Sequence, residues 1–407
     1  MKFPMTAIAL GLAAMGMTAP ASAMTVETTV QEGEQLDISK KARGPIVALQ
    51  EAVVNANYAE VPALSAEALS NAETTDDNKL IQRLLLKSAI DQQDYEAAIA
   101  PIDALGALGD SMDTYVPVYV EVGKQRMFDD NLDGASELLE KALQYQPNNS
   151  EALIALAETR TQQDRIEEGI KLLTDAIAAA EASGGAEENW YKRAVKLAYD
   201  YENPAVYGIT RDWVRAYPSA TNWRDTLRIY MGLSDADPSA FIDLMRLQNA
   251  AGALESEGDY LIYAEELLRA GFPGEAMAVI NAGKQAGAFD MNKRIVTEII
   301  GMAERNVKGD RESLDGEKSA ALSGADPKKA ITLADAYYGY GEYQTAAELY
   351  RAALGKSGVA ANVANLRLGM ALARAGDYAA AREVLSQVNG QQAEAAAYWL
   401  AWIDTQA

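Results

Sequence analysis

The chain has 407 residues, contains neither histidine nor cysteine, and carries a formal net charge of −23 with a sequence pI of about 4.5. The missing imidazole and thiol groups exclude histidine- and cysteine-based catalysis, metal sites built on these ligands, and disulfide bonds. The acidic balance repels phosphate, which argues against binding of nucleic acid or of anionic lipid headgroups.

The N-terminus has the pattern of a secretory signal peptide. A positive start at Lys2 precedes an apolar stretch from Thr6 to Thr18, and Ala21-Ser22-Ala23 provides a small-residue cleavage site. The stretch is about 13 residues long, shorter than the ~20 that span a bilayer. We therefore expect residues 1–23 to be removed and the protein to be periplasmic or secreted, although an uncleaved N-terminal anchor is the alternative. Residues 24–41 are predicted to be a flexible tail.

Residues 42–302 are predicted to form an array of helix pairs. Weak copies of a helical hairpin lie around Tyr58 and around Tyr95, and clearer copies follow. Ala142 and Ala176 lie at equivalent positions of two clearer copies, 34 positions apart. A period near 34 residues with small and aromatic residues at fixed places is typical of stacked helical hairpins.

The middle of this array departs from the pattern. The stretch from Trp190 to Tyr217 predicts two helices broken at Asn203-Pro204, and further helices are expected from Trp223 to Met231 and from Pro238 onward. Residues 260–280 fit the repeat again. Residues 303–327 carry mixed charge and few apolar residues, so we expect a charged linker or irregular helices there.

The clearest repeats lie in residues 328–407. The turn Gly341-Glu342-Tyr343 recurs 35 positions later as Gly376-Asp377-Tyr378, and the flanking apolar residues recur with it. After this pair, Ala393 to Thr405 is expected to be a solvating cap helix whose two tryptophans pack on the last repeat.

These copies resemble tetratricopeptide repeats, in which a first helix, a glycine-containing turn and a second helix with alanine at the crossing form one unit. The resemblance implies an all-α fold, a right-handed superhelical solenoid of antiparallel helix pairs. It also implies that a protein or peptide partner binds in the concave groove lined by the first helices, without a cofactor.

Projecting the family's groove onto the C-terminal pair gives a mixed basic and aromatic wall. Such a wall could hold an acidic peptide or a C-terminal carboxylate. The alternative is an ordinary solvated helix face. The candidate binding residues are Lys328, Asp335, Tyr338, Arg367, Met370 and Arg374.

One motif matches a calcium loop. Asp129, Asn131, Asp133 and Glu140 have the spacing of EF-hand ligands, and Gly134 stands at the position of the sharp turn. The repeat pattern favours another interpretation, because it places the residues from Asn131 onward in a helix. We therefore expect an acidic helix N-terminus here and no metal site.

Three functions are compatible with these patterns. The leading one is a non-catalytic scaffold that binds a protein or peptide in the bacterial cell envelope, without nucleic acid and without a membrane span in the mature chain. The second is an assembly component that acts by self-association of solenoids. The third is a carboxylate-based enzyme or a polysaccharide binder that uses aromatic residues of the middle segment, although we expect these to be core residues: Trp190, Tyr217, Trp223 and Tyr230.

Overall fold

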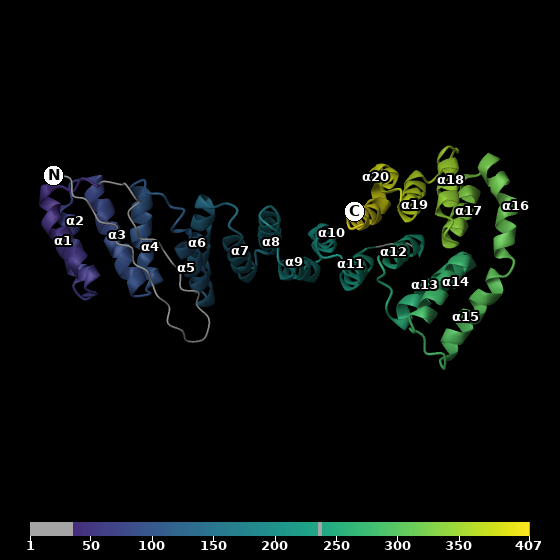
Figure 1. Cartoon of the computed structure of the whole chain (residues 1–407), viewed down its shortest axis with the longest axis horizontal. Coiled ribbons are helices and arrows are strands. Elements are labelled where there is room, and N and C mark those ends of the chain that lie inside the picture. Colours follow the sequence, from purple (N-terminus) through teal and green to yellow (C-terminus); the bar gives the residue numbers. More distant parts are fainter. Residues whose placement is uncertain (1–35, 235–237, 407) are drawn as a thin grey trace. The chain divides into compact units, whose positions relative to one another are not determined.

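The computed structural model describes residues 36–234 and 238–406, in which every regular element is a helix. Figure 1 shows the helices in order along the chain and labels α1 to α20. The chain divides between Ala186 and Glu187 into two compact units. The predicted all-α helical repeat solenoid is thereby confirmed, whereas the predicted signal peptide and residues 24–35 of the predicted tail lie outside the described residues.

The first unit is a row of helix hairpins in which each helix packs mainly on its neighbours along the chain. Its helices are α1 (Lys40–Val54), α2 (Val61–Asn71), α3 (Thr75–Asp91), α4 (Tyr95–Ala107), α5 (Val116–Phe128), α6 (Leu132–Tyr145), α7 (Ser150–Gln162) and α8 (Ile166–Glu181).

Small residues bring the helices of the first unit close together. Ala135 and Ala142 on α6 are fully buried, and a Cβ atom added to Gly123 on α5 would lie 2.8 Å from Leu139. Asparagine side chains cap the following helices: Asn131 accepts a hydrogen bond from the Gly134 amide (3.1 Å) at the start of α6. The repeat alphabet of the sequence thus acts through close helix crossings and capped helix starts.

The second unit contains the remaining helices. They are α9 (Glu188–Asp200), α10 (Ala205–Ala216), α11 (Ala220–Leu233), α12 (Pro238–Ala250), α13 (Glu257–Ala270), α14 (Pro273–Gln285), α15 (Arg294–Val307), α16 (Asp310–Ser323), α17 (Pro327–Gly339), α18 (Tyr343–Leu354), α19 (Ala361–Arg374), α20 (Tyr378–Leu385) and α21 (Ala393–Asp404), with a short 3₁₀ turn (Gly390–Gln392) before α21.

Helix α21 closes the second unit on itself. The hydroxyl groups of Thr210 on α10 and Tyr398 on α21 lie 2.9 Å apart, Arg215 pairs with Asp404 (2.8 Å), and Trp399 is fully buried. The prediction of a solvating cap on the last repeat was therefore wrong in one respect. The apolar residues of α21 pack on the last repeat and on the first helices of the unit as well, so the helices from α10 to α21 form a closed circuit of contacts.

Residues 303–327 are not an irregular linker. They hold the end of α15, all of α16 and the first residue of α17, and α16 buries Leu314 and Ala321 against the core of the unit. Arg311 and Lys318 on α16 pair with Glu342 (2.7 Å) and Glu348 (2.8 Å) on the neighbouring repeat. The charges that suggested a linker are thus the solvent-facing side of a packed helix, and the division of the chain falls earlier, at residue 186.

Part of the predicted tail also contacts the first unit. The backbone amide groups of Asp37 and Ser39 donate hydrogen bonds to the carboxylates of Asp76 (2.8 Å) and Asp77 (2.9 Å) on α3, and α1 begins at Lys40. The boundary between tail and array therefore lies a few residues before the predicted residue 42.

Candidate functional site

The six predicted binding residues lie on α17 and α19 of the second unit, opposite helices α12 to α14. Helices α14 and α17 approach each other closely because Gly339 has no side chain, and a Cβ atom there would lie 2.6 Å from that of Glu275. This approach brings acidic and basic side chains of α12 and α14 against the face of α17. The middle part of the predicted binding wall on α17 and α19 is therefore covered by α12 and α14.

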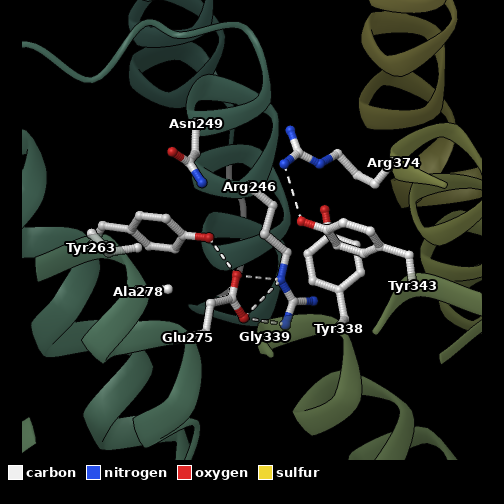
Figure 2. Close-up of a pocket in the computed structure, with 10 residues that line it drawn as sticks. Arg246, Asn249, Tyr263, Glu275, Ala278, Tyr338, Gly339, Tyr343 and Arg374 are labelled. Atoms are coloured by element: carbon white, nitrogen blue, oxygen red, sulfur yellow. Dashed lines mark hydrogen bonds and ion pairs between the residues drawn. The ribbon is translucent and has the colours of Figure 1, made fainter. Parts of the chain in front are cut away.

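The covering contact is a buried ion network centred on Arg246 of α12. Its guanidinium binds Glu275 of α14 through Nε and Nη2 (3.0 and 2.7 Å) and Asp335 of α17 through Nη1 (3.0 Å). Tyr263 donates a further hydrogen bond to Glu275 (2.5 Å), and Arg246 stacks over the ring of Tyr338 at 4.5 Å. Figure 2 shows Arg246 between Glu275 and Tyr338.

Arg367 of α19 joins the same network from the other side. Its Nε donates to both oxygens of Asp243 (3.1 Å each), and its Nη1 donates to Asp335 (2.7 Å). The hydroxyl group of Tyr350 completes the set by donating to Asp335 (2.6 Å). Four helices, α12, α14, α17 and α19, are thus linked through charged side chains that are almost fully buried.

The network corrects the prediction of a mixed basic and aromatic wall that faces a ligand, and it also excludes the alternative of a solvated face for Asp335 and Arg367. Asp335 is 2% exposed and Arg367 is 9% exposed, so the charges of both residues are neutralised inside the protein. Met370 is fully buried in the apolar core and offers no surface to a ligand. The physical reason is that the groove face of α17 and α19 is occupied by α12 and α14, which a projection from the repeat register alone does not include.

The network contains three carboxylates and two guanidiniums, a formal net charge of −1. Asp243 makes the longest contacts of the three acids, and burial raises the pKa of its carboxyl group above the ordinary value. Burial also raises the pKa of the Tyr263 and Tyr350 hydroxyl groups well above their ordinary range, so both act as proton donors in hydrogen bonds at neutral pH.

A groove with a volume of about 540 Å³ opens on one side of the network. Helix α17 contributes Lys328, Ile331, Thr332 and Asp335 to it, and α19 contributes Val363 and Arg367. Its other lining residues are Ile242, Glu266, Arg269, Ala270, Phe272 and Ala360. The groove combines an apolar lining with charged residues at its edge, and its volume lies within the range of ligand-binding pockets.

Lys328 is the accessible charge of this groove. Its side chain is exposed and makes no ion pair with any residue that the structure describes. Arg269, by contrast, is held by Glu265 (3.0 Å) and Glu266 (2.7 Å) on its own helix. A ligand in the groove would therefore meet one uncompensated positive charge next to apolar side chains.

A second, smaller pocket of about 60 Å³ lies on the other side of the network. Figure 2 shows its residues, which include Asn249, Glu275, Tyr338, Tyr343 and Arg374. Five of the six predicted residues thus line two pockets, three in the large groove and two in the small pocket. The sequence interpretation placed them on a single wall.

The residues that sequence reasoning missed are Asp243, Arg246 and Glu275. A signal for two of them was present, because Asp243 and Arg246 stand three positions apart within the predicted amphipathic helix around Leu244, Met245 and Leu247. Charged residues inside an apolar stripe are rarely buried unless they are paired. The signal predicts a partner for each, although it cannot say that the partners come from α14, α17 and α19.

The calcium motif is divided between two helices. Asp129 follows the end of α5, Asn131 caps α6, and Asp133 and Glu140 lie on α6, with Glu140 paired to Arg160 of α7. The residues from Leu132 to Glu140 are therefore helical, as the repeat register predicted, and do not wrap into a loop. In the described part of the chain no cluster of three or more acidic side chains has an arrangement that could hold a metal ion.

The aromatic residues of the middle segment are mainly core residues, as predicted. Trp223 and Tyr230 are buried in the main core of the second unit. Trp190 and Tyr217 are partly buried, and Tyr217 packs edge to face on Tyr191. An aromatic platform for a polysaccharide is therefore not formed by these four side chains.

Residues 129–183, which span the turn before α6 and helices α6 to α8, match the family model described as Tetratricopeptide repeat. No curated protein matches the chain. Among the helices that the structure describes, none combines the length and the apolar character that crossing a membrane requires.

Proposed function

Since this chain is a tetratricopeptide-repeat protein, we propose that it is an exported, non-catalytic scaffold of the bacterial cell envelope that binds a segment of a partner protein in the large groove of its second unit. Repeats of this kind suggest a protein-interaction scaffold. The observation that carries the proposal is the groove of about 540 Å³ with the unpaired Lys328 beside an apolar lining.

The chemistry of the groove indicates what kind of segment fits. Ile331 and Val363 offer contact surface for an aliphatic or aromatic side chain. Lys328 favours a carboxylate next to that side chain, through a charge-assisted hydrogen bond. Arg367 adds little to this attraction because Asp243 and Asp335 already neutralise it.

The amino-acid composition supports a non-catalytic role. The chain has no histidine and no cysteine, and the carboxylates of the site are held by arginines. Export is supported by the signal-like N-terminus ending at Ala23. Export is tested by sequencing the N-terminus of the protein recovered from the cell envelope. Recovery of the protein from the cytoplasm with residues 1–23 still attached would contradict export.

The binding proposal is tested by filling the groove. A crosslinking pull-down from envelope extract identifies the partner, and calorimetry then compares its affinity for purified variants. Val363→Trp occupies the groove and Lys328→Glu reverses its charge, so each should weaken binding at least about tenfold, or ~1.4 kcal/mol. Val47→Trp, at an exposed valine on α1, is the matched control. Equal affinity of the groove variants and the control would refute the proposal.

A further inference from the structure

Arg374 at the end of α19 differs from five other shielded arginines of the second unit. The partly or fully buried Arg211, Arg224, Arg246, Arg311 and Arg367 each pair with a carboxylate. Arg374 is also partly buried, yet it makes no ion pair with any residue in the described ranges. Its one direct partner is neutral, the hydroxyl group of Tyr343, which accepts a hydrogen bond from Nη2 (3.0 Å).

A guanidinium that loses water without gaining a counter-ion is costly. Arg374 lies over the ring of Tyr343 at 5.2 Å, and this cation–π contact offsets only part of the cost. Four of its five N–H donors remain for another acceptor. An external anion that reaches this guanidinium can provide the counter-ion that the protein itself does not supply.

The small pocket beside Arg374 has the size and the donors for such an anion. Its volume of about 60 Å³ exceeds the space that one water molecule needs and suits a group of four or five heavy atoms. The hydroxyl groups of Tyr338 and Tyr343 and the amide of Asn249 surround the same space as the guanidinium, as Figure 2 shows. These groups come from four helices, so donors reach the pocket from several directions.

The one acidic residue among those that line this pocket does not cancel the charge of Arg374. Glu275 is already bound by Arg246 through two nitrogens and by the hydroxyl group of Tyr263. Among the charged residues that line the pocket, Arg374 is therefore the one whose charge is not taken up by the buried network, which itself has a formal net charge of −1. The unpaired charge of Arg374 matches a small anion that the guanidinium can bind directly.

We propose that the pocket formed by Arg374, Tyr338, Tyr343 and Asn249 binds a small oxyanion, with Arg374 making a bidentate contact to two oxygens of the ligand. This site is separate from the large groove, from which it is divided by the buried ion network. It does not depend on the proposed protein partner. A free anion such as phosphate and a small carboxylate share the required chemistry.

The test is a titration of the purified chain starting at Met24 with sodium phosphate and, separately, with sodium acetate at constant ionic strength. All five tryptophans lie in the second unit, so thermal unfolding followed by tryptophan fluorescence reports on this unit alone. At ten times its dissociation constant, a bound anion should raise Tm by about 4 °C. Stabilisation by phosphate alone identifies a tetrahedral oxyanion, and stabilisation by acetate as well identifies a general oxyanion site.

Variants assign the effect to the pocket. Arg374→Gln should raise the dissociation constant at least about tenfold, whereas Arg351→Gln, at an exposed arginine of α18, should leave it unchanged. If Arg374→Gln does not fold, Tyr343→Phe removes only a hydroxyl group and should weaken binding about threefold or more. Stabilisation no greater than that of sodium chloride, or equal affinity of the variants and the wild type, would overturn the proposal while leaving protein binding in the large groove untouched.

Discussion

The two units use the same helix hairpin in different ways. Contacts in the first unit join residues about one repeat apart, as between Arg83 and Asp110 (2.9 Å). The second unit adds contacts between distant parts of the sequence, such as Thr210 with Tyr398 and Asp243 with Arg367. The first unit is therefore an open array, whereas the second is a closed circuit of helices.

This difference determines where a binding site can form. In an open array each repeat depends on its nearest neighbours, so the array bends and opens locally. A closed circuit fixes the distance between opposite helices, and only such a fixed distance allows charged residues of α12 and α14 to be buried against α17 and α19. The large groove and the small pocket are the spaces left on either side of that buried contact.

Removing α21 should have the largest effect, because it opens the circuit. A chain that ends at Gln392 loses the fully buried Tyr398 and Trp399 and the nearly buried Trp402 from the core. Truncating one large aromatic residue costs about 3–5 kcal/mol, so the loss of three exceeds the stability of most domains. We expect tryptophan emission of the second unit to shift to the red in native buffer.

The matched control removes the first two helices from the open array. A chain that begins at Glu73 should keep the cooperative unfolding of α3 to α8, because the end of an array supports only its neighbour. Circular dichroism at 222 nm measures helix in both units, whereas tryptophan fluorescence measures the second unit alone. If the chain without α21 unfolded like the full chain, the closed circuit would not be needed for stability.

Arg246→Met should have the next largest effect. The change leaves Asp243, Glu275 and Asp335 buried with Arg367 as the one remaining guanidinium of the network. Removal of one partner from a buried ion pair costs about 3–5 kcal/mol. Urea unfolding followed by tryptophan fluorescence should show this loss in the second unit.

Arg160→Met provides the comparison in the open array. Arg160 is buried to a similar degree, but its acidic partners Glu140 and Glu168 are largely exposed and can return to water. The expected loss in the free energy of unfolding is about 1 kcal/mol, and circular dichroism measures it. Equal losses for the two substitutions would mean that the closed circuit gives its buried charges no special role.

The helix hairpins could be predicted from the sequence, but the contact of α21 with α10 that closes the second unit could not. Repeated glycine, alanine and tyrosine positions predict α17 to α20, and Asn203-Pro204 predicts the break between α9 and α10, because these signals are local. The contact of Tyr398 with Thr210 depends on the accumulated curvature of the ten α-helices between α10 and α21. Small differences in the crossing angle of each helix pair decide whether α21 reaches α10. No single sequence position encodes these angles.

The candidate site shows the same limit. Lys328, Tyr338 and Arg374 were predicted to share one groove wall, whereas the structure places them at two pockets, and their part in binding stays a prediction. Asp335 and Arg367 were expected at the surface. The repeat register predicts which face of its helix each residue occupies, but it does not predict which other helices pack on that face. Asp243 and Arg246 were passed over because their charge was not weighed against their apolar neighbours.

The buried network should also make the second unit respond to pH. Because the pKa of Asp243 is higher in the folded chain than in the unfolded one, the folded state binds a proton more tightly. Stability contributed by Asp243 is therefore present at low pH and lost as the pH rises through the folded pKa. The charged groups around Asp243 are Arg246, Arg367 and Asp335, and the two guanidinium groups keep their positive charge between pH 4 and pH 8.

The measurement is urea unfolding by tryptophan fluorescence between pH 8 and pH 4, for the wild type and Asp243→Asn. The wild type should gain stability on acidification, by up to about 1.4 kcal/mol for each pH unit between the two pKa values, relative to the variant. Circular dichroism reports on both units, so the part of its transition that tryptophan fluorescence does not show belongs to the first unit and serves as the internal reference. A variant with the same pH dependence as the wild type would place the titrating group elsewhere.

The smallest expected effect comes from removing single helix caps. The two units should respond to this loss in different ways. Asn131→Ala removes the cap of α6 in the open array, and Ser256→Ala removes the cap of α13 in the closed circuit. Each change costs about 1 kcal/mol of helix stability. In the open array the cost should appear locally, as faster hydrogen exchange of amides in α6.

In the closed circuit the same cost should lower the stability of the whole second unit, because α13 cannot open without loosening α12 and α14. Hydrogen exchange measured along the chain, together with the urea midpoint of tryptophan fluorescence, distinguishes the two behaviours. Millimolar calcium should change neither α6 exchange nor its response to Asn131→Ala, since Asn131 acts as a helix cap. Exchange that quickens throughout the first unit after Asn131→Ala would show that the array, too, behaves as one cooperative body.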